Sequence, residues 1–252
     1  MHMNRLYRVL ILLLGIALAS CSQDDQASAT EKAVKSETSA VGGSKNLSGG
    51  VISTAEAAPA KQSPELVQKG KELYGQNCIF CHQPDAIGKP GIAPSLTNQE
   101  FLMMASDKFI MGTIRDGRNG TGMPPFAHLG RSGVEAILAF LRDHAKRPNI
   151  SAKIDKEKQV HGDERLGKLW FDQICSTCHG MNGDGYARGG TGTAIGKVGF
   201  LGKASDGFIR ETIKVGRTNT RMLGFSGPDG MANMADSEIE DVIAYLRTVP
   251  SK

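Results

Sequence analysis

Apolar residues recur three and four positions apart in the helical segments of residues 63–252, as they do on one face of an amphipathic α-helix. The segment with Val134, Ile137, Leu138 and Leu141 is a typical example. No segment alternates polar and apolar residues as a half-buried strand does, and Gly-rich loops separate the helical segments. We therefore predict an all-α protein in which long loops connect the helices.

Capping residues predict where these helices begin and end. Ser63 followed by Pro64 predicts the start of a first helix that runs to Cys78, because Ser caps the first helical turn and Pro is favoured in it. Each half of the chain then has a middle helix between a Ser and a Gly, and a last helix that opens with a capping box. These signals are Ser106 with Gly117, Ser205 with Gly216, Ser132-x-x-Glu135 and Ser237-x-x-Glu240, and Pro250 is expected to end the final helix.

The two halves of this pattern are copies of one unit. Similar segments recur in the same order: Gly70-Lys71 and Gly167-Lys168, Ser106-Asp107 and Ser205-Asp206, Ile114-Arg115 and Ile213-Lys214, Leu141-Arg142 and Leu246-Arg247. Such a duplication predicts tandem domains of about three helices each, at residues 63–147 and 163–252. The polar, weakly patterned residues 148–162 are expected to link them.

The first 62 residues differ from the rest. Residues 1–20 contain two arginines followed by the apolar stretch Val9–Ala19, which is too short to span a membrane and is typical of a signal peptide. Residues 21–62 are rich in Ser, Ala, Gly and Thr and have almost no large apolar side chains. Such a composition cannot bury enough surface to fold, so we expect a disordered tether.

The signal sequence leads into Leu18-Ala19-Ser20-Cys21, which resembles the lipobox of bacterial lipoproteins. The resemblance implies that Cys21 is acylated and anchors the protein to a membrane on the periplasmic side, since several acyl chains hold a protein stably. An Asp directly after the Cys would favour retention in the inner membrane. This chain has Ser22 there instead, so the outer membrane is favoured. The alternative is an ordinary secretory signal with an incidental Cys.

Four of the five cysteines belong to two C-x-x-C-H motifs, at residues 78–82 and 175–179. This pattern is typical of c-type haem attachment, in which both thiols bond to the haem vinyl groups and the His ligates the iron. A dithiol redox pair needs no following His, and a zinc site built from all four thiols would leave both His unused. We therefore predict two covalently attached haems c per chain, and an exported protein agrees with this because bacteria attach c-type haem outside the cytoplasm.

A second axial ligand for each iron is expected between the middle and last helices. Met123 and Met222 both lie there, each after a Gly-Arg step and three residues before a Phe. A thioether favours ferrous iron, so His/Met ligation raises the reduction potential, and occupation of both axial positions keeps substrates from the iron. Met231 is the alternative to Met222, because the second half has extra residues in this region, and Met234 is expected to pack beneath the last helix.

The order of C-x-x-C-H, a Pro-containing loop and a Met before a final capped helix resembles class I cytochrome c. Its duplication over residues 63–252 resembles the two-haem members of that family. The resemblance implies an all-α fold of two tandem cytochrome c domains. It also implies two haem sites: Cys78 and Cys81 with axial ligands His82 and Met123, and Cys175 and Cys178 with axial ligands His179 and Met222.

Members of this family cross their first and last helices at a small residue. Gly70 and Gly167 fit this place, each opposite an aromatic residue of the last helix. Pro94 resembles the residue whose carbonyl accepts the ring N–H of the axial His. No equivalent Pro occurs in residues 191–201, so the sequence predicts no such partner for His179.

The expected function is one-electron transfer between respiratory redox proteins, by a carrier that is not an enzyme and has no small-molecule substrate. The 30 Lys and Arg nearly balance the 26 Asp and Glu and form no basic stripe with aromatic residues, so nucleic acid is not a sensible partner. The alternatives are a two-haem peroxidase or thiosulfate-oxidising enzyme, an electron-transfer subunit of a larger dehydrogenase or oxidase complex, and a gas or redox sensor. A Met in each half and the lack of a spare Cys argue against the enzymes.

Overall fold

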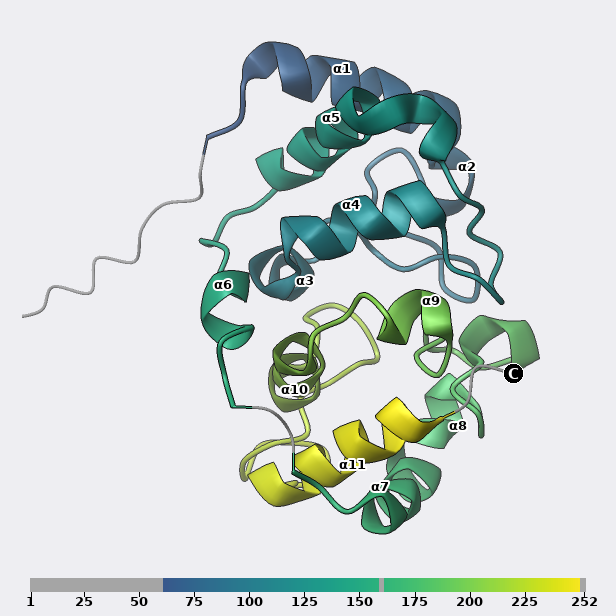
Figure 1. The fold of residues 1–252 in the computed structure, drawn as a ribbon, viewed down its shortest axis with the longest axis vertical. Coiled ribbons are helices and arrows are strands. Elements are labelled where there is room, and N and C mark those ends of the chain that lie inside the picture. Colours follow the sequence, from purple (N-terminus) through teal and green to yellow (C-terminus); the bar gives the residue numbers. More distant parts are fainter. Residues whose placement is uncertain (1–60, 159–160, 250–252) are drawn as a thin grey trace, which may run out of the picture. The chain divides into compact units, whose positions relative to one another are not determined.

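The computed structural model describes residues 61–158 and 161–249. The predicted signal peptide, the lipidated Cys21 and nearly all of the tether lie outside these residues, as does Pro250. Within the described ranges the chain forms helices and three isolated β-bridges but no strand, so the all-α prediction is confirmed (Figure 1). None of these helices has both the length and the apolar composition that crossing a lipid bilayer requires.

The first half has the three predicted longer helices and several short ones that the sequence pattern did not predict. The longer helices are α1 (Pro64–Asn77), α4 (Asp107–Asp116) and α5 (Gly130–Asp143). The short ones are α2 (Ile79–His82), α3 (Gln99–Met104), η1 (Ala127–Leu129) and, in the predicted linker, α6 (Ser151–Ile154). Asn98 explains α3, because its side chain accepts a hydrogen bond of 2.9 Å from the Phe101 N–H and so caps a helix where only a loop was expected.

The second half repeats the order of the α-helices and differs in its short turns. Its elements are α7 (Glu164–Trp170), η2 (Phe171–Cys175), α8 (Ser176–His179), η3 (Gly185–Arg188), α9 (Val198–Leu201), α10 (Asp206–Val215) and α11 (Asp236–Thr248). The segment η2 is a π-helical turn, whereas α1 runs as a regular α-helix to Asn77, next to the first Cys motif. π-helical turns inside helices often lie at functional sites, and this one ends at Cys175.

The predicted Ser caps and Gly stops are confirmed. Ser63, Ser106 and Ser205 each accept a hydrogen bond from the backbone N–H three residues later, at 3.5, 3.1 and 3.1 Å. The middle helices α4 and α10 are followed by Gly117 and Gly216. Their φ angles of 65° and 70° lie in the left-handed region that favours glycine.

The capping box predicted at Ser132 is wrong. The turn η1 leads directly into α5, which begins at Gly130, so the chain is already helical before Ser132. Glu135 therefore does not reach back to a helix start and instead forms an ion pair of 2.7 Å with Arg131.

The capping box predicted at Ser237 is also wrong. Helix α11 begins one residue before Ser237, and Glu238 accepts a hydrogen bond of 2.8 Å from the N–H of Ala235. Glu240, the predicted partner of Ser237, instead forms an ion pair with Arg210. The helix therefore has two acidic residues in its first turn, Asp236 and Glu238, where the helix dipole favours them, but the predicted Glu240 is not one of them.

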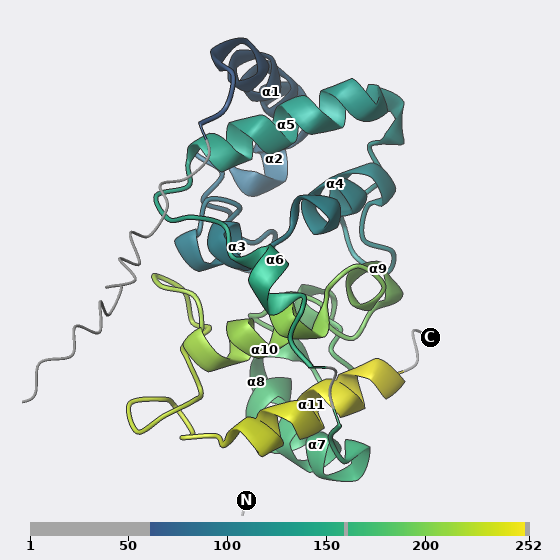
Figure 2. The ribbon, with the colours of Figure 1, turned by 60° about the vertical axis from the view of Figure 1, so that its left-hand side comes forward.

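The first and last helices of each half lie against each other at the predicted glycines, as Figures 1 and 2 show for α1 with α5 and α7 with α11. A Cβ at Gly70 would clash with the carbonyl of Ala136 and lie 2.8 Å from the Cβ of Phe140. A Cβ at Gly167 would clash with the carbonyl of Asp241 and lie 2.9 Å from the Cβ of Tyr245. The two backbones therefore touch without intervening side chains, and the predicted role of both glycines is confirmed.

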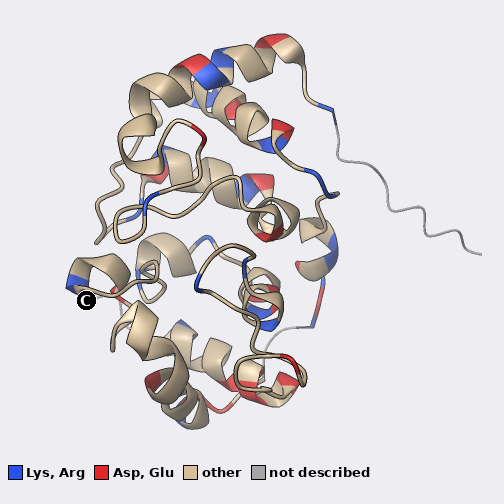
Figure 3. Cartoon of the chain, turned by 180° about the vertical axis from the view of Figure 1, so that it is seen from behind, with Lys and Arg blue, Asp and Glu red and all other residues tan. Residues whose placement is uncertain are grey.

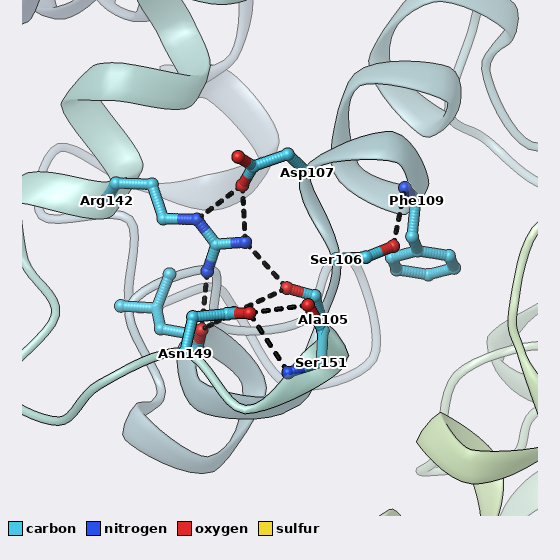
Figure 4. A network of polar contacts seen from close by, with 8 residues as sticks. Ala105, Ser106, Asp107, Phe109, Arg142, Asn149 and Ser151 are labelled. Carbon is cyan, nitrogen blue, oxygen red and sulfur yellow. Dashed lines mark hydrogen bonds and ion pairs between the residues drawn. The ribbon is translucent and has the colours of Figure 1, made fainter. Parts of the chain in front are cut away.

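Arg142, in the last turn of α5, links this helix to α3, to the start of α4 and to the residues between them (Figure 4). Its guanidinium donates hydrogen bonds of 2.7–2.9 Å to the Asp107 carboxylate and further bonds to the carbonyls of Leu102 and Ala105. Arg247 of α11 repeats the set with Asp206, Leu201 and Ala204. The duplication thus extends from the sequence to a whole polar network.

The two halves pack against each other through four phenylalanines. The rings of Phe109 in α4 and Phe208 in α10 lie 5.0 Å apart between their centroids. Phe101 in α3 and Phe200 in α9 each contact both of these rings at 6.1–6.4 Å. Because Phe101 and Phe200 occupy matching places in the two halves, as do Phe109 and Phe208, the cluster is nearly symmetric.

Charged side chains of both signs are interspersed along the helices (Figure 3). Some of them pair locally on the surface, such as Arg115 with Asp116 at 2.6 Å and Arg165 with Asp163 at 3.2 Å. Exposed pairs of this kind contribute little stability. Apolar packing, the two helix contacts and the arginine networks therefore determine the fold.

We expect Gly70→Ala to destabilise the protein by about 1–3 kcal/mol, because the added methyl group forces α1 away from α5. Gly75→Ala is the matched control, since Gly75 lies in the same helix and a Cβ there would have nothing within 4 Å. Replacing that exposed glycine should stabilise the helix by about 0.5–1 kcal/mol. Thermal unfolding followed by circular dichroism measures both, and equal melting temperatures for the two variants would contradict the proposed contact.

Candidate haem-attachment sites

Each Cys motif forms a single helical turn at the end of the first helix of its half. In the first half, the N–H groups of Cys81 and His82 donate to the carbonyl of Cys78 at 3.2 and 2.9 Å. All four motif cysteines are free thiols and partly buried. Burial, with a smaller contribution from the neighbouring Cys, raises the pKa of Cys78 to about 11 and that of Cys175 to about 12. The thiols of Cys78 and Cys175 are therefore protonated at neutral pH.

The imidazole of His82 is buried and held by the loop that follows α2. Its side chain is 8% exposed, and Nδ1 lies 2.9 Å from the carbonyl oxygen of Pro94. Since a carbonyl only accepts, Nδ1 carries the proton, and Nε2 keeps its lone pair for a metal. The predicted partnership with Pro94 is confirmed.

His179 has the same arrangement with a partner that the sequence did not predict. Its Nδ1 donates to the carbonyl of Thr193 at 2.7 Å. Gly192 makes this approach possible, because a Cβ there would lie 2.8 Å from both Cε1 and Nδ1 of the ring. The sequence carried no signal for Thr193, since any residue can present a backbone carbonyl, although the neighbouring glycines marked a loop that comes close to other groups.

Burial is the main cause that lowers the pKa of both imidazoles. The hydrogen bonds to Pro94 and Thr193 act in the opposite direction, and nearby arginine charges lower the pKa further. Both rings are therefore neutral at pH 7, which is the form that ligates iron.

The loops with Met123 and Met222 have the same backbone hydrogen bonds. The N–H of Arg118 donates to the Met123 carbonyl at 3.0 Å, and the N–H of Arg217 donates to the Met222 carbonyl at 2.6 Å. In both loops a Thr hydroxyl two residues before the Met accepts from the Met N–H, at 3.2 and 3.0 Å. Met222 is thus the structural counterpart of Met123.

Met231 and Met234 differ from this pattern. Met231 is 63% exposed, and its N–H donates to the carbonyl of Gly224 at 2.9 Å. Met234 is 3% exposed and belongs to the core that packs on α11, as the sequence predicted. Neither residue has the backbone hydrogen bonds that Met222 and Met123 have in their two matching loops.

Two mostly buried arginines lie close to the imidazoles. Arg118 lowers the pKa of both His82 and His179 through its charge, and Arg217 lowers that of His179. Burial lowers the pKa of each arginine to about 10, so both stay charged at pH 7. Neither forms an ion pair with a carboxylate within the part of the chain that the structure describes.

These side chains fit haem c. Each half has two thiols and an imidazole with a free Nε2 in one helical turn, together with a loop that carries a thioether. They do not fit an ordinary metal site, because no group of three His, Cys, Asp or Glu that could hold an ion occurs in residues 61–158 and 161–249.

Comparison with known families agrees with this arrangement. Residues 65–141 match the family "Cytochrome C oxidase, cbb3-type, subunit III", and residues 165–250 match the family "Cytochrome c". The fold and the duplicated sites therefore define a protein with two cytochrome c domains. The chain belongs to the two-haem c-type cytochromes.

Curated relatives are respiratory proteins. The chain is 28% identical to the Cbb3-type cytochrome c oxidase subunit CcoP of Rubrivivax gelatinosus, in a match that covers 63% of this chain and 48% of the relative. It is 28% identical to the subunit FixP of a Bradyrhizobium species, covering 66% and 58%. It is 26% identical to the cytochrome bc1 complex cytochrome c subunit of Mycobacterium leprae, covering 81% and 70%. The chain thus spans about half of the length of the oxidase subunits that it matches.

We expect Gly192→Ala to displace the His179 ring, because the new methyl group would overlap Cε1 and Nδ1. The visible spectrum of the reduced protein should then show normal ligation at one haem and weakened ligation at the other. Gly122→Ala is the control. Gly122 lies next to Met123, the predicted axial ligand of the first haem, but a Cβ there would have nothing within 4 Å. An unchanged spectrum for Gly192→Ala would contradict the tight fit around His179.

Proposed function

We propose that this chain is a membrane-anchored electron carrier with two covalently attached haems c. Cys78 and Cys81 bind the first haem, with His82 and Met123 as axial ligands. Cys175 and Cys178 bind the second, with His179 and Met222 as axial ligands. The shared hydrogen bonding of the two Met loops is the observation that supports a common His/Met site in both halves.

Bound haem c supplies an iron that changes between ferrous and ferric states by one electron. The chain contributes the ligands and their orientation. The carbonyls of Pro94 and Thr193 fix the tautomer of each imidazole, so Nε2 stays available whichever redox state is present. Soft thioether ligands favour the ferrous state and raise the potential.

A carrier is favoured over an enzyme because each half has a Met loop in place. An enzyme that acts on peroxide needs an open or displaceable position at one iron, and the hydrogen bonds that hold Met123 and Met222 are the same in both halves. The proposal gives the halves equivalent ligands and leaves no position for a substrate.

We place the protein on the periplasmic side of a bacterial membrane, anchored through acyl chains on Cys21, with respiratory redox proteins as partners. The lipobox-like Leu18-Ala19-Ser20-Cys21 supports the anchor. A second candidate is an electron-transfer subunit of a larger complex, because the relatives named above are subunits of an oxidase and of a bc1 complex.

The haem assignment is tested by the mass of the intact protein, which should exceed that of the chain by two haems, and by acid acetone, which should leave the colour with the protein. Exposure of the reduced protein to carbon monoxide tests the carrier. No rapid change in the spectrum is expected, because both axial positions are occupied. A colourless protein after extraction would overturn the covalent attachment, and fast binding at one haem would overturn the pure carrier.

We expect Met222→Leu to remove the far-red absorption band of Met-to-iron ligation from one of the two haems, and to lower the potential of that haem. Met231→Leu is the matched control, since it removes the alternative thioether from an exposed position. The band should then integrate to one haem in the first variant and to two in the second. The reverse result would assign the second iron to Met231.

We expect Cys21→Ser to release the protein from membranes, because the acyl chains have no attachment point. Fractionation of cells that express each form measures this, with the haem spectrum as a check that export and haem attachment are intact. If the variant remained as firmly bound as the natural chain, either the lipid anchor or the free-carrier model would be wrong, and detergent extraction together with any co-purifying complex would show which.

A further inference from the structure

Arg118 contacts elements of both haem sites. Its backbone N–H donates to the carbonyl of Met123 in the first half. Its guanidinium crosses to the second half, where it donates to the carbonyl of Ala194 and lies 5.0 Å from the ring centroid of Phe200. Ala194 directly follows Thr193, whose carbonyl holds the ring of His179. One residue thus joins the Met loop of the first site to the His loop of the second.

Arg217 occupies the matching position in the second half but does not make the matching link. Its N–H binds the carbonyl of Met222, and its guanidinium lies over Phe101 and Phe208 at 5.2 and 5.5 Å. Within residues 61–158 and 161–249, its guanidinium donates no hydrogen bond to the loop that carries Pro94. Each guanidinium therefore lies against a ring of the other half, but only that of Arg118 also donates a hydrogen bond to the His loop of the other half.

We propose that Arg118 is a positioning residue that couples the two haem sites, whereas Arg217 serves only the second site. The inference rests on the proposed function, because it concerns the potentials of the two bound haems. Through Arg118, the first half contributes both a charge and a hydrogen bond to the His loop of the second site, whereas Arg217 contacts the first half at the ring of Phe101.

The physical reason is an unscreened positive charge. The guanidinium of Arg118 has a carbonyl and an aromatic face as neighbours instead of a carboxylate, so its charge is not cancelled within the described residues. Oxidation adds a positive charge at the iron, which a nearby cation opposes. Arg118 therefore stabilises the reduced state at both sites, in agreement with its effect on the pKa of both imidazoles.

The test measures the potential of each haem in the full holoprotein by spectroelectrochemical titration, with the two waves assigned through Met123→Leu and Met222→Leu. In Arg118→Gln, the ratio of oxidised to reduced haem at a fixed potential should rise about tenfold at both sites. This equals a fall of 59 mV for a one-electron couple. Arg217→Gln should shift the potential of the second site and leave that of the first unchanged. Arg118→Lys keeps the charge, so the ratio of oxidised to reduced haem at each site should stay within about threefold of its value in the unmodified protein.

A shift in Arg118→Gln that is confined to the first site would overturn the coupling, as would an equal shift in Arg118→Lys. Arg118→Met keeps an apolar side chain against Phe200 and replaces the Gln variant if that one does not load haem. If both neutral variants lose haem, mass analysis of the haem peptides decides: loss from the second half alone supports the link, and any other pattern contradicts it. The proposed function fails separately, since it predicts two haems in the unmodified protein.

Discussion

A hydrogen bond from a histidine ring N–H to a backbone carbonyl determines the geometry of each site. It fixes which nitrogen carries the proton, and it requires the loop after the Cys motif to fold back onto the ring. In the first half this return depends on Gly88, whose N–H binds the His82 carbonyl and whose φ of 77° suits a residue without a Cβ. In the second half Gly192 provides the space. The glycines of these loops therefore serve the imidazoles, and the imidazoles in turn fix where an iron can be bound.

The duplication preserves backbone contacts more closely than side chains. Both halves keep a helix contact at glycine, an Arg that binds two carbonyls and an Asp, and a Met loop with the same hydrogen bonds. Side chains differ where the backbone can supply the same group: Thr193 replaces Pro94 because only a carbonyl is needed. Tyr74 donates a hydrogen bond of 2.7 Å from its hydroxyl to the Gln83 carbonyl. Its counterpart in the second half is Phe171, which has no hydroxyl, and the π-helical turn begins at this residue.

The sequence predicted those features that depend on a particular residue type. Glycines at the helix contacts and the serines that cap α1, α4 and α10 have few chemical substitutes, and their positions were predicted correctly. The haem-binding role of the motif Cys and His stays a prediction. Features that any residue can provide were missed, such as the carbonyl of Thr193 and the turn that starts α5 before Ser132. The contacts of Arg118 with the other half were also missed, since they depend on how two distant segments pack.

The buried and mostly buried arginines are of two kinds, those that form an ion pair with a carboxylate and those that do not. Arg142 and Arg210 each have a carboxylate partner, Asp107 for the first and Glu240 for the second, so their charges are balanced within the fold. Arg118 and Arg217 are mostly buried and have only carbonyls, ring faces or weaker electrostatic partners. A buried charge without a carboxylate partner costs stability. Their placement near the imidazoles leaves an unbalanced positive charge beside these rings, which is the charge that the proposed effect of Arg118 on the haem potentials requires.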